Sequence, residues 1–182
     1  MRIAVMGTGA VGGYFGAKLA AAGHDLVFIA RGNHLEAMRR AGLRIDSASA
    51  ALQVRDSLFT HNPAESGTVD LVLFCVKSYD TETAAQALAP LIGDTTMILS
   101  LQNGIDNPEK IAQAWGAQRT FAGVVYVGAQ VTAPGVIFHS SGGKIVLGPY
   151  DSASNRPAAE LIAQTLSSAG IDCTVSRNVP KV

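Results

Sequence analysis

The residues with the clearest chemical meaning form one short glycine segment near the start of the chain, Gly7-Thr8-Gly9-Ala10-Val11-Gly12. It follows an apolar run, Ile3 to Met6, that predicts a buried strand, and it precedes a helical pattern. In this context Gly7 permits a tight turn, Gly9 lets the backbone approach a diphosphate, and Gly12 lets the helix pack closely. The helix N-terminus would then offer amides and a positive dipole end to phosphates. The segment predicts a dinucleotide-binding turn, although a glycine-rich turn without a ligand shares the pattern.

A positively charged residue, Arg31, follows the second predicted strand, Asp25 to Ala30. A carboxylate at this place would bind the ribose 2′-hydroxyl of NAD and would repel a 2′-phosphate. A guanidinium instead offers a planar, permanently charged fork that matches phosphate oxygens. The sequence therefore predicts NADP(H) in preference to NAD(H). The alternative interpretation is a solvated arginine at the start of a helix.

Two further polar residues follow predicted buried strands. The run Leu71 to Val76 leads to Lys77, and the strand Thr96 to Leu101 leads to Gln102-Asn103-Gly104. Open α/β sheets bind ligands at the carboxyl ends of their strands, so both residues would lie at the ligand edge. The Lys77 ammonium could reach cofactor phosphate or ribose oxygens, and the Asn103 amide could bond a ribose or a substrate hydroxyl. A solvated lysine and an ordinary Asn-Gly turn are the alternatives.

Together these features resemble the ketopantoate reductase (2-dehydropantoate 2-reductase) family, over nearly the whole chain. The resemblance rests on the glycine segment, on Arg31, on Cys75-Val76-Lys77, on Leu101-Gln102-Asn103-Gly104, and on a late hairpin ending His139-x-x-Gly142-Gly143-x-x-x-x-Gly148. It implies that the glycine segment, Arg31 and Lys77 hold NADPH, and that Asn103 lies where nicotinamide and substrate meet. For the complete enzyme it implies hydride transfer to the ketone carbon of 2-dehydropantoate, giving pantoate, a step of pantothenate biosynthesis.

The chain departs from the family pattern at its end. The family has a second, all-helical domain that supplies the general acid, a lysine in a Trp-x-Lys motif, and most substrate contacts. No such motif occurs here, so no catalytic residue is expected in this chain and the lysine is expected beyond Val182. Lys181 has no tryptophan two residues before it and is interpreted as a linker residue, while Trp115 is expected in the core. The chain alone should bind cofactor and turn over poorly.

Two other functions remain open from the sequence. One is a related hydroxyacid or polyol-phosphate dehydrogenase that shares the first domain. The other is a non-enzymatic NADP(H)-binding regulatory module. The sequence that follows the predicted domain in the complete polypeptide would discriminate them.

Strand-like and helical patterns alternate along the first two-thirds of the chain, which favours an α/β fold. We predict a Rossmann-type, doubly wound, mainly parallel sheet with an added antiparallel hairpin region, without the helical C-terminal domain. Residues 1–175 would form the NADP-binding domain, and residues 176–182 a linker stub. Strands are expected at 2–6, 25–30, 43–45, 52–54, 71–76, 96–101 and 171–175, helices at 11–22, 33–41, 81–91, 105–115 and 157–169, and hairpin strands at 121–130, 136–139 and 144–147.

The composition limits the classes of molecule that the chain is expected to bind. Fourteen basic and fourteen acidic residues balance, so nothing indicates binding to nucleic acid or to an anionic membrane. A small-molecule 2-keto acid is the expected partner, and self-association is left open. Two distant cysteines and four histidines show no disulfide or metal-ligand spacing, so no metal is expected: Cys75, Cys173, His24, His34, His61 and His139. His139 is expected to be structural. With no signal peptide and no membrane span in the sequence, a cytoplasmic location is expected.

Overall fold

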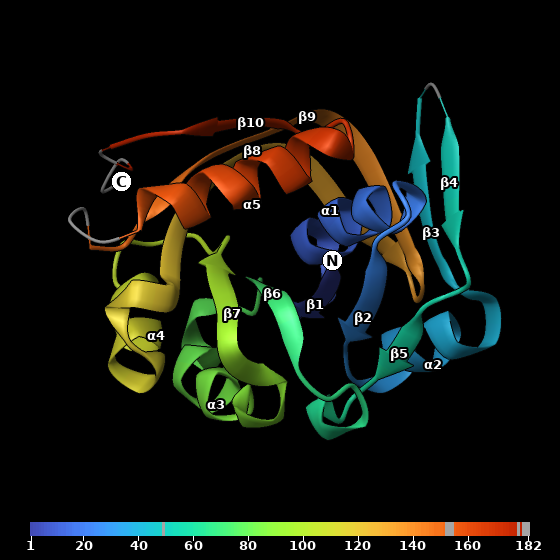
Figure 1. Cartoon of the computed structure of the whole chain (residues 1–182). Helices are drawn as coiled ribbons and strands as arrows, with labels where there is room; N and C mark the ends of the chain where they lie inside the picture. The colour runs from blue at the N-terminus through green and yellow to red at the C-terminus, as the bar shows by residue number, and fades with distance from the viewer. Residues whose placement is uncertain (49, 152–154, 178, 180–182) are drawn as a thin grey trace.

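The sheet is the frame of the molecule. The computed structural model describes residues 1–48, 50–151, 155–177 and 179. Strands in this part of the chain form one sheet of order β4-β3-β9-β8-β7-β6-β1-β2-β5, and β10 pairs with β9 (Figure 1). Their bounds are β1 (Arg2–Met6), β2 (Asp25–Ile29), β3 (Leu43–Ser47), β4 (Ala51–Val54), β5 (Leu58–Thr60), β6 (Val69–Phe74), β7 (Ile92–Ser100), β8 (Thr120–Ala133), β9 (Val136–Pro149) and β10 (Asp172–Val175).

The order of the parallel strands is that of a doubly wound sheet. The strands β5-β2-β1-β6-β7-β8 are all parallel, and their sequence order along the sheet is that of a Rossmann domain. Strand β9 adds to β8 in antiparallel fashion, and β3 and β10 then pair in parallel with β9. The predicted fold class is therefore confirmed. The order reverses between β1 and β6, and this crevice is where such sheets bind their ligands.

Helices cover both faces of the sheet. Their bounds are α1 (Ala10–Ala21), α2 (Gly32–Ala41), α3 (Thr81–Gln86), α4 (Asn107–Trp115) and α5 (Arg156–Ser168). Figure 1 shows α1 and α5 inside the curve of the sheet, with α3 and α4 on the opposite side. Strand β1 sends Ile3 and Val5 into the core under α1 and α5, and Ala4 and Met6 into the core under α3 and α4. This alternation is the two-residue period of a strand buried on both faces.

Two predicted helix and strand assignments near the middle of the chain need correction. The helix expected at 81–91 ends at Gln86 and gives way to a separate 3-10 turn, Ala89–Leu91. Pro90 explains the break, because it has no amide hydrogen and its ring collides with the preceding helical turn. Strand β5 was not expected. Its three residues are too few to give a periodic signal, and the strand is held by pairing with β2 and by stacking of Phe59 on Phe28.

The predicted pair of hairpins is in fact one long hairpin. Strands β8 and β9 pair along almost their whole length, and the segment Ser141-Gly142-Gly143 lies inside β9 instead of forming a turn. Gly142 and Gly143 adopt φ values of +73° and +126°, and the register shifts opposite them between Tyr126 and Ala129. These are the marks of a β-bulge. The strands expected at 136–139 and 144–147 are thus two halves of β9.

No helix in the described residues is long and apolar enough to cross a bilayer.

Candidate functional site

The glycine loop between β1 and α1 is closely packed at two of its glycines. Gly7 has φ +95°, and a Cβ there would lie 2.8 Å from the Val76 nitrogen. A Cβ on Gly12 would lie 2.5 Å from the Gly7 carbonyl oxygen and 2.8 Å from Val5 Cγ1. The amides of Gly7 and Thr8 both donate to the Ile29 carbonyl, at 3.2 and 2.9 Å. The fold itself therefore requires glycine at positions 7 and 12.

Gly9 differs from its neighbours because nothing in the protein explains it. Its φ of −90° suits any residue, and no heavy atom beyond Gly9 and its two chain neighbours lies within 4 Å of the point that a Cβ would occupy. The first helical hydrogen bond runs from the Gly13 nitrogen to the Gly9 oxygen at 2.8 Å, so the amides of Ala10, Val11 and Gly12 precede it. The Gly9 amide donates to the Gly7 carbonyl at 2.8 Å, whereas the amides of Ala10, Val11 and Gly12 have no hydrogen-bond partner within the described residues. First-turn amides without a partner, beside an exposed glycine, are suited to binding an anion.

The two predicted cationic residues flank this loop on neighbouring strands. Arg31 follows β2 and caps α2, two residues after the carbonyl that binds Thr8. Lys77 follows β6, next to Val76, which packs against Gly7. Both side chains are exposed, and neither makes a hydrogen bond or ion pair within the described part of the chain. The order β2-β1-β6 therefore places one cation on each side of the glycine loop.

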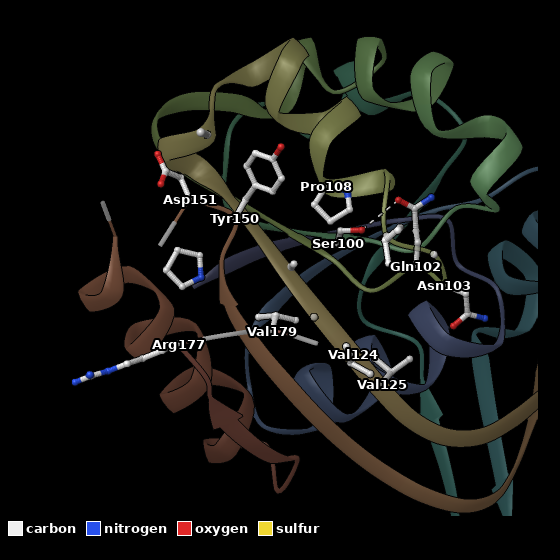
Figure 2. A pocket seen from close by; sticks show the side chains of 16 residues that line it. Ser100, Gln102, Asn103, Pro108, Val124, Val125, Tyr150, Asp151, Arg177 and Val179 are labelled. Carbon is white, nitrogen blue, oxygen red and sulfur yellow. Dashed lines mark hydrogen bonds between the residues drawn. The ribbon is translucent and has the colours of Figure 1, made fainter. Parts of the chain in front are cut away.

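A cavity of about 960 Å³ opens beside the carboxyl end of β7, the first half of β8 and the end of β9. Figure 2 shows Gln102 and Asn103 on one side of it and Tyr150 and Asp151 on the other, with Val124 on the strand between them. Of the predicted site residues, Asn103 alone is among the described residues that line this cavity. The site accordingly has two parts. One is the glycine loop with a cation on each side, and the other is the cavity, which Asn103 lines.

Sequence reasoning missed the polar side chains that hold the Asn103 turn. The Asn103 carbonyl accepts hydrogen bonds from Ser78 Oγ at 3.0 Å and from Asn107 Nδ2 at 2.7 Å. Gln102 Nε2 donates to the Val76 carbonyl at 2.9 Å. The only signal in the sequence was the gathering of Ser, Gln and Asn residues after two buried strands, and it does not say which of them pair.

His34 makes a structural contact that the sequence did not predict. It lies in the first turn of α2, and its Nδ1 accepts a hydrogen bond of 3.0 Å from the Gly135 nitrogen at the tip of the β8–β9 hairpin. Burial lowers the pKa of His34, and the backbone of Thr8 opposes this shift to a smaller degree. The ring is therefore held neutral, between the glycine loop and the hairpin.

The remaining candidates are structural. Burial raises the pKa of Cys75 to about 12, and burial together with Asp172 raises that of Cys173 to about 11, so both remain weakly nucleophilic thiols. His139 stacks on Tyr14 with ring centroids 4.3 Å apart, and Trp115 donates to the Ala85 carbonyl beside the core. No group of three or more His, Cys, Asp or Glu residues in the described ranges could hold a metal ion. Lys181 lies outside the described residues.

Comparison with known proteins settles the family. The family model for ketopantoate reductase PanE/ApbA matches residues 3–152. The chain belongs to this family. The part of the chain that matches the ketopantoate reductase family includes the glycine loop, Arg31, Lys77, Asn103 and the β8–β9 hairpin.

Relatives extend the match to most of the chain. A 2-dehydropantoate 2-reductase from Mesorhizobium japonicum is 34% identical over 98% of this chain and 61% of its own length. A crystal structure of a PanE/ApbA family ketopantoate reductase from Ralstonia eutropha JMP134 has a TM-score of 0.87 at 38% identity, covering 98% of this chain and 57% of that one. A 2-dehydropantoate 2-reductase from Geobacter metallireducens GS-15 gives a TM-score of 0.90 at 32% identity, over 97% and 58%. The chain spans about three fifths of these relatives.

The neutral state of His34 predicts a pH dependence of stability. Because burial disfavours the charged ring, the unfolded chain takes up a proton near the ordinary pKa of 6.5 before the folded chain does. Stability from this residue is complete above that pH and is lost as the pH falls below it. We expect the thermal unfolding midpoint to fall less between pH 7 and pH 5 in His34→Asn than in the unchanged chain, as followed by circular dichroism.

His61 provides the matched control, because it is exposed. His61→Asn should keep the pH slope of the unchanged chain. If the His34→Asn curve runs parallel to that of the unchanged chain, the neutral ring does not contribute as described.

Proposed function

We propose that this chain is the cofactor-binding domain of an NADPH-dependent enzyme that reduces 2-dehydropantoate to pantoate. The domain would comprise residues 1–175, with residues 176–182 leading into the rest of the protein. The proposal is supported by the family, by the names of relatives such as the reductase from Mesorhizobium japonicum, and by the geometry of the glycine loop. A small 2-keto acid is the proposed substrate class. A cytoplasmic location and self-association stay predictions.

The observation that carries the proposal is the contrast among the loop glycines. Gly7 and Gly12 are crowded by protein atoms, whereas the position of a Cβ on Gly9 is open. A glycine without a steric or conformational need in the protein is explained by a ligand that approaches its backbone. Thr8, Ala10 and Val11 complete the loop, whose first-turn amides would bind the cofactor diphosphate. The residues present thus fit a dinucleotide.

The two cations beside the loop support a proposed orientation of that dinucleotide. Arg31 is unpaired in the described residues and would bind the 2′-phosphate of NADP(H) on the β2 side of the loop. Lys77 would bind phosphate or ribose oxygens on the β6 side, and Asn103 would bond the ribose or substrate where the nicotinamide meets the cavity. NADPH, when bound, supplies the hydride. These residues bind and orient the reactants, and the part of the protein beyond this chain would supply the general acid.

The preference for NADP(H) can be tested at Arg31. A hydrogen-bonded charge pair with phosphate contributes about 1.5–3 kcal/mol, so Arg31→Ala should raise the Kd for NADPH about 10- to 100-fold. The Kd for NADH should change by less than about twofold, because NADH has no 2′-phosphate for the side chain to bind. Isothermal titration calorimetry with both cofactors measures the difference.

Arg40 is the control, because it is an exposed arginine in the last turn of the same helix. Arg40→Ala should leave both dissociation constants unchanged. Equal losses for NADPH and NADH in Arg31→Ala would remove Arg31 from the 2′-phosphate site and leave the choice of cofactor to other residues.

The rate of NADPH oxidation tests whether this chain binds the cofactor without supplying the general acid. A missing general acid lowers the rate by about 10²–10⁴-fold, so this chain should bind NADPH yet oxidise it with 2-dehydropantoate at least about 100-fold more slowly than a complete enzyme. The full-length relative from Mesorhizobium japonicum, assayed alongside by loss of NADPH absorbance, sets the reference. Comparable rates would show that the proton donor lies within this chain.

A further inference from the structure

We infer that Asn107, acting with Ser78 and Gln102, is a positioning residue that sets Lys77 and Asn103 relative to each other and so determines how the site holds the nicotinamide half of the cofactor. The inference rests on the proposed function and deepens it. The cluster Ser78, Thr81, Gln102 and Asn107 is called the Asn107 tether below.

Asn107 is the centre of this tether. It is the first residue of α4 and is 4% exposed. Its Nδ2 donates to the Asn103 carbonyl at 2.7 Å and to Ser78 Oγ at 3.3 Å, while its Oδ1 accepts from Thr81 Oγ1 at 2.8 Å. The buried amide therefore has partners on both sides, and they fix its orientation. Loss of this side chain would remove one hydrogen bond each from the Asn103 carbonyl, the Ser78 hydroxyl and the Thr81 hydroxyl.

The tether joins the main chain on both sides of Lys77 to the Asn103 turn. Before Lys77, the Val76 carbonyl accepts from Gln102 Nε2 at 2.9 Å. After it, Ser78 Oγ donates to the Asn103 carbonyl at 3.0 Å. Gln102 Nε2 also donates to Thr81 Oγ1 at 2.8 Å, which links it to the Asn107 side of the cluster. The two strand-end turns are thus held to each other at several points.

The tether leaves the side chains of Lys77 and Asn103 available to a ligand. The side chains of Lys77 and Asn103 are exposed and make no hydrogen bond within the described residues, whereas the main chain beside them is bonded. A fixed backbone with unoccupied functional groups is the arrangement that binds a ligand with little reorganisation. The tether thus contributes to binding without itself touching the cofactor.

Strand order indicates which half of the cofactor is affected. Arg31 follows β2, the glycine loop follows β1, and Lys77 and Asn103 follow β6 and β7, in the spatial order β2-β1-β6-β7. If the 2′-phosphate lies at Arg31 and the diphosphate at the glycine loop, an extended dinucleotide continues toward β6 and β7. The Asn107 tether therefore acts on the nicotinamide half and leaves the adenosine half alone.

A pair of ligands separates these halves. We would titrate the chain with NADPH and with adenosine 2′,5′-bisphosphate, which carries the adenosine end of the cofactor without the nicotinamide. Asn107→Ala should raise the Kd for NADPH about tenfold, while the Kd for the bisphosphate stays within about twofold. Ser78→Ala removes the bond to the Asn103 carbonyl and the longer one from Asn107, both at an exposed residue, and leaves the other bonds of the tether in place. It should give a smaller change, about threefold, with the same selectivity.

Thr96→Val is the matched control. Thr96 is also buried, and its Oγ1 donates to the Val69 carbonyl at 2.6 Å and accepts from the Gly93 nitrogen at 2.8 Å, away from the ligand edge. The control should lower the thermal unfolding midpoint, as Asn107→Ala does, and leave both dissociation constants unchanged. It thereby separates a loss of stability from a loss of position.

Every outcome decides the inference. Selective loss of NADPH affinity in Asn107→Ala supports it. Parallel loss for both ligands, or unchanged NADPH affinity, in folded Asn107→Ala overturns it while the proposed function stands. If Asn107→Ala does not fold, Ser78→Ala gives the same decision. If the unchanged chain binds neither ligand, the proposed function fails and takes this inference with it.

Discussion

The close approach of helix α1 to strand β1 is the contact on which the rest of the structure depends. Glycines allow it, because a Cβ on Gly12 or on Gly16 would lie 2.8 Å from a methyl group of Val5 in β1. A Cβ on Gly13 would likewise meet Ile137 of β9. The helix therefore lies in the curve of the sheet and contacts strands as far apart in the sheet as β2 and β4. Its first turn is fixed at the carboxyl edge, where the amides of Ala10, Val11 and Gly12 have no hydrogen-bond partner within the described residues.

This placement explains why charge and polarity gather where they do. The strand order reverses beside β1, so the loops that follow β2 and β6 leave from either side of the glycine loop. Arg31 and Lys77 are carried to those positions by the backbone alone, with no hydrogen bond or ion pair from the described residues to hold their side chains. The next loop, after β7, brings Asn103 to the rim of the cavity. The strand order around the glycine loop thus places several candidate ligand groups along one edge of the sheet.

The sequence was sufficient for features that depend on local pattern. Continuous apolar runs predicted β1, β2, β6 and β7 to within a few residues, and the glycine spacing predicted the turn before α1, because burial and helix packing leave a direct mark on residue type. The same reasoning failed at Gly142-Gly143, since two glycines suit a turn and a bulge equally well, and pairing with β8 decides between them. It also failed at β5, whose three residues take their structure from β2.

For the candidate site, too, local features could be predicted from the sequence and contacts between distant segments could not. Residues that follow directly from strand ends, such as Arg31, Lys77 and Asn103, could be named from the sequence. Contacts between distant segments could not, because spacing does not show that Ser78 bonds the Asn103 carbonyl or that His34 accepts from Gly135, 101 positions away. Those contacts arise only once the sheet brings the loops together.

The proposed function requires the first-turn amides of α1 to bind the cofactor diphosphate. An amide-resolved nuclear magnetic resonance titration of the isotope-labelled chain with NADPH tests this binding. Saturable shifts that are largest at the amides of Ala10, Val11 and Gly12 are the predicted result. Saturable binding of NADPH that leaves those three amides unchanged, and shifts residues elsewhere, would contradict it.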